Sequence, residues 1–231
     1  SGLFGAWPSR RRSLLRLRIR PLPAATDQPV RTPVHAGLSE GALDCPPDSQ
    51  GLVLFAHGSG SSRHSPRNNH VARVLRERGL ATLLVDLLTP EEDRVYATRF
   101  DIPLLTQRLL DVTDWARRQP ATALLPMGYF GASTGAAAAL SAAASQGAGI
   151  RAVVSRGGRP DLAPARDLAR VQCPTLLLVG ACDEEVLALN RCAAAHMPGP
   201  THLTIVPGAT HLFEEPGTLE AVGRLAADWF A

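Results

Sequence analysis

The chain contains no lysine, and arginine therefore supplies all 24 of its basic residues. Aromatic residues make up only 5% of the sequence, while 45% is hydrophobic and 19% charged, which excludes a disordered chain and fits a globular one. No apolar run approaches the roughly 18 residues that cross a bilayer, so we expect no stable membrane insertion. A length of 231 residues allows one domain with a large core.

Cysteine is scarce as well, and the spacing of the four cysteines matches no metal-binding pattern. We find no signal-peptide pattern before them, which favours free thiols and a cytoplasmic location. His57, His64 and His70 lack carboxylates at ligand spacing, and no dinucleotide fingerprint is present. We therefore expect neither a metal nor another cofactor.

Positive charge is concentrated at the N-terminus. Six arginines and no acid fall within the first 20 residues, which leaves 18 arginines against 21 acidic residues in the rest of the chain. We interpret residues 1–30 as an irregular basic extension, either flexible or packed at an edge. Contact with an anionic surface and a targeting role are the alternatives, although arginines interrupt the apolar residues at 14–19. We expect no nucleic-acid partner.

The rest of the chain alternates between two kinds of pattern. Short apolar runs predict buried strands, and longer stretches with a helical apolar face predict helices between them. This alternation is typical of an α/β domain over residues 31–231, with a mostly parallel sheet flanked by helices on both faces. The expected strands are 51–56, 80–85, 127–130, 150–154, 175–179 and 202–206, after an antiparallel pair within 32–45; the expected helices are 66–78, 102–118, 136–144, 184–196 and 216–230.

The segment Gly131-Ala132-Ser133-Thr134-Gly135 reads G-x-S-x-G between a predicted strand and an alanine-rich predicted helix. A serine on such a sharp strand-to-helix turn exposes its hydroxyl, and the two glycines leave room for the turn and for close packing. We predict that Ser133 is the nucleophile of an acyl-transfer reaction. A Gly/Ser turn leading into a core helix is the alternative.

A serine nucleophile needs a base to accept its proton and an acid to orient that base. Asp183 and His211 each follow a predicted strand, and the carboxyl ends of parallel strands meet at one edge of a sheet. We predict that His211 is the base and Asp183 the orienting acid. A helix cap at Asp183 and a surface position for His211 are the alternatives, with Glu184 and Asp161 as other candidate acids.

The oxyanion of the reaction needs two N–H donors. We expect one from Thr134, directly after the nucleophile, and the second from Ser59 in the Gly/Ser loop after strand 51–56. That loop lacks the Gly-Lys-Ser/Thr ending of a phosphate-binding P-loop. Arg63 and Arg156 lie in nearby loops and are candidates for binding an anionic group of the substrate, or are simply solvated.

These features together resemble the α/β-hydrolase superfamily, and residues 55–68 (FAHGSGSSRHSPRN) and 154–161 (VSRGGRPD) resemble its dienelactone-hydrolase-like branch. The likeness covers about residues 32–231 and implies the α/β-hydrolase fold, with a mixed sheet of about eight strands and a Ser/Cys-His-Asp triad. In some relatives this subgroup is joined to a phosphoribosyltransferase domain. Dienelactone hydrolases proper carry cysteine as nucleophile, whereas Ser133 here implies a serine esterase-like reaction.

Cap domains of this fold often follow the strand after the helix that begins at the G-x-S-x-G turn, and only residues 155–173 are available there. We therefore expect no large cap, and a serine hydrolase, monomeric or homodimeric, that cleaves small or short-acyl esters. A non-catalytic binding module is the alternative from another class. Acyl transfer or dienelactone-type hydrolysis at the same site also stays open.

Overall fold

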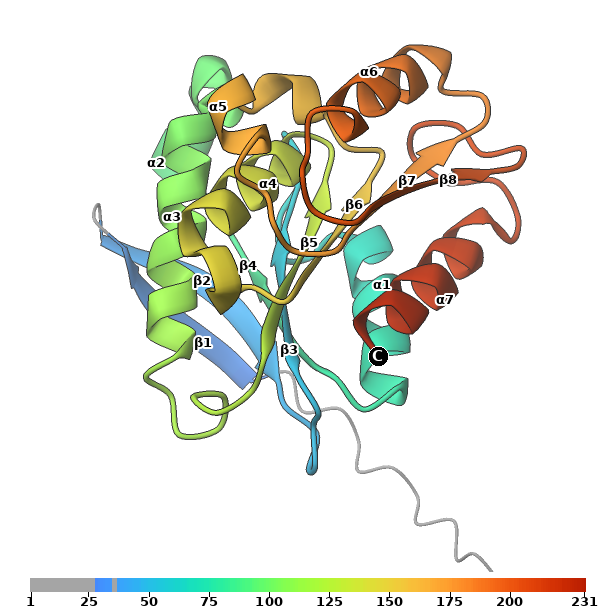
Figure 1. Ribbon diagram of the computed structural model, residues 1–231. Helices are drawn as coiled ribbons and strands as arrows, with labels where there is room; N and C mark the ends of the chain where they lie inside the picture. Colours follow the sequence, from blue (N-terminus) through green and yellow to red (C-terminus); the bar gives the residue numbers. More distant parts are fainter. Residues whose placement is uncertain (1–27, 35–36) are drawn as a thin grey trace, which may run out of the picture.

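The computed structural model describes residues 28–34 and 37–231, so the arginines of the N-terminal extension and our interpretation of them lie outside the described part. An eight-stranded sheet forms the centre of the molecule (Figure 1). Its order is β1 (Gln28–Val34), β2 (Gly37–Asp44), β4 (Ala81–Val85), β3 (Leu52–Ala56), β5 (Met127–Ala132), β6 (Ala152–Arg156), β7 (Thr175–Gly180) and β8 (Thr201–Val206).

Strand direction divides this sheet into two parts. The six strands from β4 to β8 in this order run parallel, while β1 and β2 add an antiparallel edge. All five residues of β3 are buried, as expected of a central parallel strand that is covered on both faces. The carboxyl ends of β3, β5, β6, β7 and β8 therefore meet at one edge, which is where the predicted site residues follow their strands.

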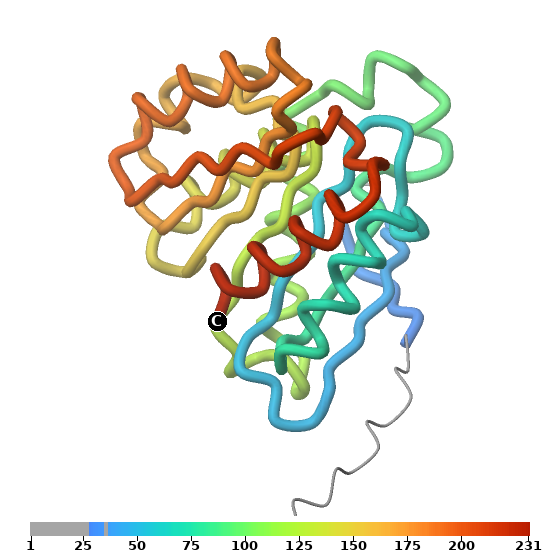
Figure 2. The backbone as a smooth tube through the Cα atoms, turned by 90° about the vertical axis from the view of Figure 1, so that its right-hand side faces the viewer, coloured from blue at the N-terminus to red at the C-terminus, as the bar shows by residue number. Residues whose placement is uncertain are grey.

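Helices cover both faces of the sheet. On one face lie α3 (Ile102–Ala116), α4 (Thr134–Gln146) and α6 (Glu184–Ala194). On the other face α1 (Pro66–Glu77) and α7 (Thr218–Phe230) lie side by side (Figure 2). Successive residues of β3 alternate between the two cores, with Leu54 in the first and Phe55 in the second. The remaining short elements are α2 (Pro90–Asp93), α5 (Ala165–Leu168) and the 3₁₀ turns at Tyr96–Phe100, Gly147–Gly149 and Pro160–Leu162.

The predicted α/β-hydrolase fold is confirmed, with two local differences. Strand β1 begins at Gln28, inside the stretch that we interpreted as irregular because proline interrupts it. Pro29 is tolerated because β1 is an edge strand that pairs on only one side. Helix α2 was not predicted, although Thr89 and Glu92 form a capping box at its start.

The connection between β6 and β7 contains only a 3₁₀ turn and the four-residue α5, which agrees with the prediction that no large cap is inserted there. Among the described residues, no helix has both the length and the apolar character needed to span a membrane.

Candidate active site

Ser133 lies on the turn between β5 and α4, with φ +50° and ψ −120°. A non-glycine residue at positive φ is strained by roughly 1–3 kcal/mol, and such strain is concentrated at functional sites. Serine at the first position of a helix normally caps it, but the Ser133 side chain makes no such bond. Its hydroxyl, partly exposed, is therefore not used by the helix.

The two glycines of the motif permit this turn by removing side chains at close contacts. A Cβ atom on Gly135 would lie 2.2 Å from the carbonyl oxygen of Ala56 at the end of β3. A Cβ atom on Gly131 would lie 2.5 Å from the Cα atom of Ala136. The first turn of α4 thus packs directly against β3 and β5, which fixes the position of Ser133.

Asp183 and His211 meet although they follow different strands. The Nδ1 atom of His211 lies 2.6 Å from Oδ2 of Asp183, and the Asp183 side chain is only 14% exposed. Asp183 occupies the N-cap position of α6, yet its carboxylate makes no capping bond. With Nδ1 bound to a carboxylate, Nε2 is the nitrogen of His211 that remains to accept a proton.

The other candidate acids are placed differently. Both carboxylate oxygens of Asp161 accept hydrogen bonds from Arg159, at 2.8 and 2.7 Å, and this pairing raises the pKa of the guanidinium. Glu184 is exposed in the first turn of α6.

The backbone of residues 156 and 157 lies between His211 and the turn that carries Ser133, which we call the serine elbow. The N–H of Ser133 donates to the carbonyl of Arg156 at 3.3 Å. At the next residue, Gly157, a Cβ atom would lie 3.5 Å from both Nδ1 and Cε1 of His211. The imidazole therefore lies beside the elbow. In the described part of the chain the Ser133 hydroxyl has no hydrogen-bond partner, and catalytic bonds of this kind often shorten only when substrate binds.

The loop after β3 carries the predicted second oxyanion donor. His57 accepts a hydrogen bond at Nε2 from Leu87 N–H, 3.1 Å, so its Nδ1–H donates to the carbonyl of Gly58, 2.9 Å. Ser61 N–H donates to the same carbonyl. Because the C=O and N–H of a trans peptide point in opposite directions, the N–H of Ser59 is turned away from these donors.

Ser59 and Thr134 face a common hollow. Both line a small recess of about 10 Å³, and Gly58 lies close enough that a Cβ atom there would be 3.1 Å from Cβ of Ser133. Within residues 28–34 and 37–231, neither of the two N–H groups has a hydrogen-bond partner. A larger cavity of about 270 Å³ adjoins the recess, since both are lined by His57, Leu88 and Asp93.

The two candidate arginines have different surroundings. Arg63 lines the larger cavity and forms ion pairs with Asp86 and Glu40, so its charge is already matched by carboxylates. Arg156, at the end of β6, is only 8% exposed and has no such pair among the described residues. Burial, reinforced by the charge of Arg67, lowers the pKa of Arg156 to about 10.

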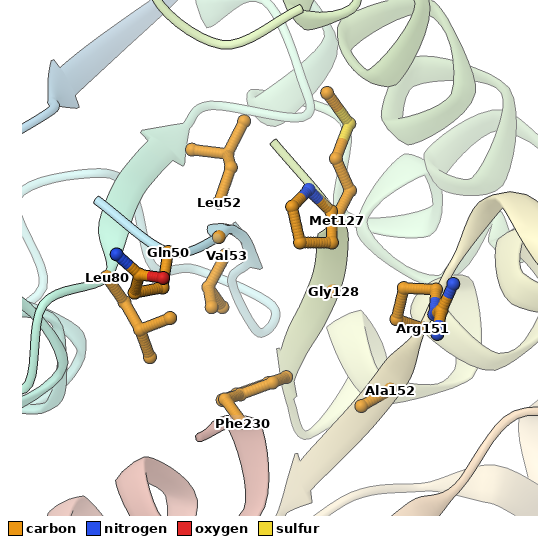
Figure 3. Close-up of a pocket in the computed structure, with 11 residues that line it drawn as sticks. Gln50, Leu52, Val53, Leu80, Met127, Gly128, Arg151, Ala152 and Phe230 are labelled. Carbon is orange, nitrogen blue, oxygen red and sulfur yellow. The ribbon is translucent and has the colours of Figure 1, made fainter. Parts of the chain in front are cut away.

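A third hollow lies at the opposite end of the strands. It measures about 60 Å³ and is formed where Leu52, Met127 and Ala152 begin β3, β5 and β6, beside Phe230 (Figure 3). None of the predicted site residues lines it. In the described ranges, no three His, Cys, Asp or Glu side chains gather as a metal site would require.

No family model matches the chain. The crystal structure of a dienelactone hydrolase from Anabaena variabilis is 51% identical to it, with a TM-score of 0.86 over 89% of this chain and 97% of the other. Est1E from Butyrivibrio proteoclasticus is 17% identical with a TM-score of 0.75, over 87% and 97% of the two chains, and shares the fold.

Two curated Mycobacterium tuberculosis proteins, each named "Putative phosphoribosyl transferase", are 60% identical to the chain over 212 residues. This alignment covers 90% of the chain but 48% of each relative, so the chain spans about half the length of the curated relatives it matches. The Anabaena enzyme, by contrast, is covered almost completely. On this identity and coverage, the chain belongs to the dienelactone-hydrolase-like branch of the α/β-hydrolase superfamily.

Proposed function

We propose that the protein is a serine hydrolase that cleaves small or short-acyl carboxylic esters through an acyl-enzyme on Ser133. The observation that carries this proposal is the 2.6 Å bond between Asp183 and His211, beside a strained serine whose hydroxyl caps no helix. Hydrolase and esterase relatives of the same fold support the reaction class.

The proposed reaction has two halves, acylation of Ser133 and hydrolysis of the acyl-enzyme, and the same catalytic groups act in both. Nε2 of His211 takes the proton of Ser133 while Oγ attacks the ester carbonyl carbon. The N–H groups of Ser59 and Thr134 stabilise the negative oxygen that results. The bond to the alcohol then breaks, and the alcohol leaves with the proton held by His211. Water repeats these steps on the acyl-enzyme and releases the acid, which restores Ser133.

The proposed preference for short acyl groups rests on the shape of the site. The recess at Ser59 and Thr134 holds about 10 Å³, and the β6–β7 connection offers only the four-residue α5 in place of a cap. The adjoining cavity of about 270 Å³ is lined in part by the charged side chains of Glu40, Arg63 and Asp86, which disfavour a long alkyl chain there.

A panel of p-nitrophenyl esters of increasing chain length, assayed with and without a serine-directed inhibitor, tests this proposal. We expect kcat/KM to be highest for the acetate to hexanoate esters, and the inhibitor to abolish turnover. Turnover that resists the inhibitor would contradict the acyl-enzyme, and faster turnover of long-chain esters would contradict the proposed substrate size. Analysis of products with an added alcohol acceptor separates hydrolysis from acyl transfer.

We further propose that the phosphoribosyl transferase named in the mycobacterial relatives belongs to the half of those proteins that this chain does not match. The 48% coverage supports this, because this chain, which matches only that half, covers 97% of a dienelactone hydrolase. Incubation of this chain with phosphoribosyl diphosphate and nucleobases should yield no nucleotide, and nucleotide formation would contradict the proposal.

A further inference from the structure

Arg156 is buried beside the elbow without a matching negative charge. Its Nε and Nη1 groups have no hydrogen-bond partner among the described residues, and its Nη2 reaches only Oδ1 of Asn68, at 3.5 Å. The ring of Phe213 lies 5.9 Å from its Cζ atom. A buried charge is costly unless it is paired and hydrogen-bonded, so this guanidinium lacks what normally accompanies such burial.

A second arginine, Arg67, directly precedes Asn68, the residue that Arg156 contacts. Arg67 is close enough that its positive charge contributes to lowering the pKa of Arg156. Nη1 of Arg67 contacts Oε1 of Glu214 at 2.9 Å, while its buried Nε has no partner in the described part of the chain. Glu214 is 63% exposed, so the ion pair of Arg67 is with a solvated carboxylate, while three nitrogens of the two guanidinium groups have no hydrogen-bond partner among the described residues.

Two other arginines of the protein are paired with carboxylates. Arg108, which is 2% exposed against 8% for Arg156, also has an Nε without a hydrogen-bond partner in the described part of the chain, but it forms an ion pair of 2.5 Å with Glu92. Arg159, only three positions after Arg156, holds both oxygens of Asp161. Unlike these two arginines, Arg156 has no carboxylate partner among the described residues, so its buried charge is uncompensated.

The position of the pair connects it with the proposed reaction. The carbonyl of Arg156 accepts a hydrogen bond from the N–H of Ser133, and Phe213 and Glu214 lie two and three positions after His211. Asn68 lies in the first turn of α1, where the helix dipole also favours negative charge. The two guanidinium groups therefore lie between the serine elbow, the histidine loop and the N-terminal end of α1.

We propose that Arg156 and Arg67 form an anion subsite that holds a carboxylate or phosphate carried by the ester substrate. The inference rests on the proposed esterase function and adds to it that the substrate is an acidic ester. The planar guanidinium groups present parallel N–H donors, which suit the oxygens of either anion. The partly exposed side chain of Arg67 provides the entry to the subsite from solvent.

The test compares mono-p-nitrophenyl adipate with p-nitrophenyl hexanoate, which have acyl chains of equal carbon number and differ in the terminal carboxylate. We expect kcat/KM to favour the adipate by about tenfold or more, in line with charge-assisted hydrogen bonds. In Arg156→Met and in Arg67→Met this ratio should fall towards unity. The ratio is the readout because any loss of folded enzyme affects both esters equally. Arg67→Met keeps the test valid if Arg156→Met does not fold.

Arg159→Met is the matched control, because it removes a nearby positive charge that is already paired. It should leave the adipate preference within about twofold, since a paired surface charge contributes little. An equal loss in Arg159→Met would indicate a general positive field and would overturn the subsite. Equal rates for the two esters in the parent protein, or a preference that survives Arg156→Met, would overturn it too.

A second readout separates this inference from the proposed function. At constant ionic strength, inorganic phosphate should raise the Tm of the parent protein, and this rise should be lost in Arg156→Met. If neither ester is cleaved, the esterase proposal fails, and the phosphate-dependent Tm still decides whether the anion site exists. A phosphate effect without adipate preference would indicate a site for free anions and would overturn its assignment to the substrate.

Discussion

Asp183 and His211 are 28 positions apart in the chain, yet Oδ2 of Asp183 and Nδ1 of His211 lie 2.6 Å apart. They meet because each follows the carboxyl end of a strand in the same parallel sheet, β7 for the acid and β8 for the histidine. A carboxylate in this position holds the proton of His211 on Nδ1, which leaves Nε2 free to accept a proton.

Replacing Asp183 by Asn should lower kcat/KM by about 10²–10⁴, because an amide does not hold the proton on Nδ1 as a carboxylate does. Steady-state kinetics on a short p-nitrophenyl ester measures the loss. Asp161→Asn is the comparison, since its carboxylate is bound by Arg159 and we expect a loss of less than threefold, as for an ordinary surface ion pair. The opposite order of effects would move the orienting acid to residue 161.

Ser133→Ala should lower ester turnover by about 10⁴ or more and should exceed the effect of Asp183→Asn, because the attacking atom itself is removed. Circular dichroism and Tm should remain those of a folded protein. Ser145→Ala makes the same change near the end of α4, where Oγ bonds to the carbonyl of Ser141, and should retain parental rates. Near-parental turnover by Ser133→Ala would remove Ser133 as the nucleophile.

Two substitutions of His57 should separate its two hydrogen bonds. In His57→Asn the amide nitrogen replaces the Nδ1 donor to Gly58, whereas in His57→Gln the amide oxygen replaces the Nε2 acceptor for Leu87 N–H. We expect the Gln variant to lose about 10²-fold or more in kcat, because the peptide that presents Ser59 N–H then keeps only one of its two hydrogen bonds, the one from Ser61.

The Asn variant should keep more of its kcat and lose stability instead, since the buried N–H of Leu87 is left unpaired at a cost of about 1–3 kcal/mol. Kinetics and urea unfolding of the two variants check this division. Equal effects of both substitutions on kcat would argue against a role of His57 in positioning the oxyanion donor.

Gly135→Ala should prevent stable folding or cost more than about 3 kcal/mol, because the new methyl group would lie 2.2 Å from a backbone oxygen of β3. Gly147→Ala is the matched control. Gly147 is the C-cap residue of α4, with φ +53° and ψ −128°, but a Cβ atom there would meet no atom within 4 Å, so backbone strain of about 1–3 kcal/mol is the whole expected cost. Urea unfolding distinguishes the two, and similar losses would contradict the close packing of the elbow on β3.

The sequence predicted the sheet and its main helices because apolar runs and helical periodicity are local signals. It was less informative where a signal was overridden or short. Pro29 concealed the start of β1, since sequence does not reveal that a strand lies at an edge. Helix α2 has only four residues and none of them is buried, so periodicity could not find it.

For the site, the G-x-S-x-G motif and the positions after strands were sufficient to select Ser133, Asp183 and His211 as candidates and to expect the contact between Asp183 and His211. Their catalytic roles stay predictions. Side-chain pairing was not predictable in the same way. Arg63 pairs with Glu40, 23 positions earlier on β2, and Arg156 approaches Asn68 across 88 positions. Such contacts depend on how distant segments come together. The sequence therefore did not indicate that Arg67 belongs to the surroundings of Arg156.

The most direct test of the central claim is labelling with a fluorophosphonate, followed by mass spectrometry of the digested protein. A serine activated by a neighbouring imidazole reacts with this reagent, whereas an ordinary serine does not. We predict stoichiometric modification of the peptide that contains Ser133, and its loss in His211→Ala, which keeps the serine but removes the base. Absence of labelling in the folded parent protein, or labelling at another residue, would contradict the account.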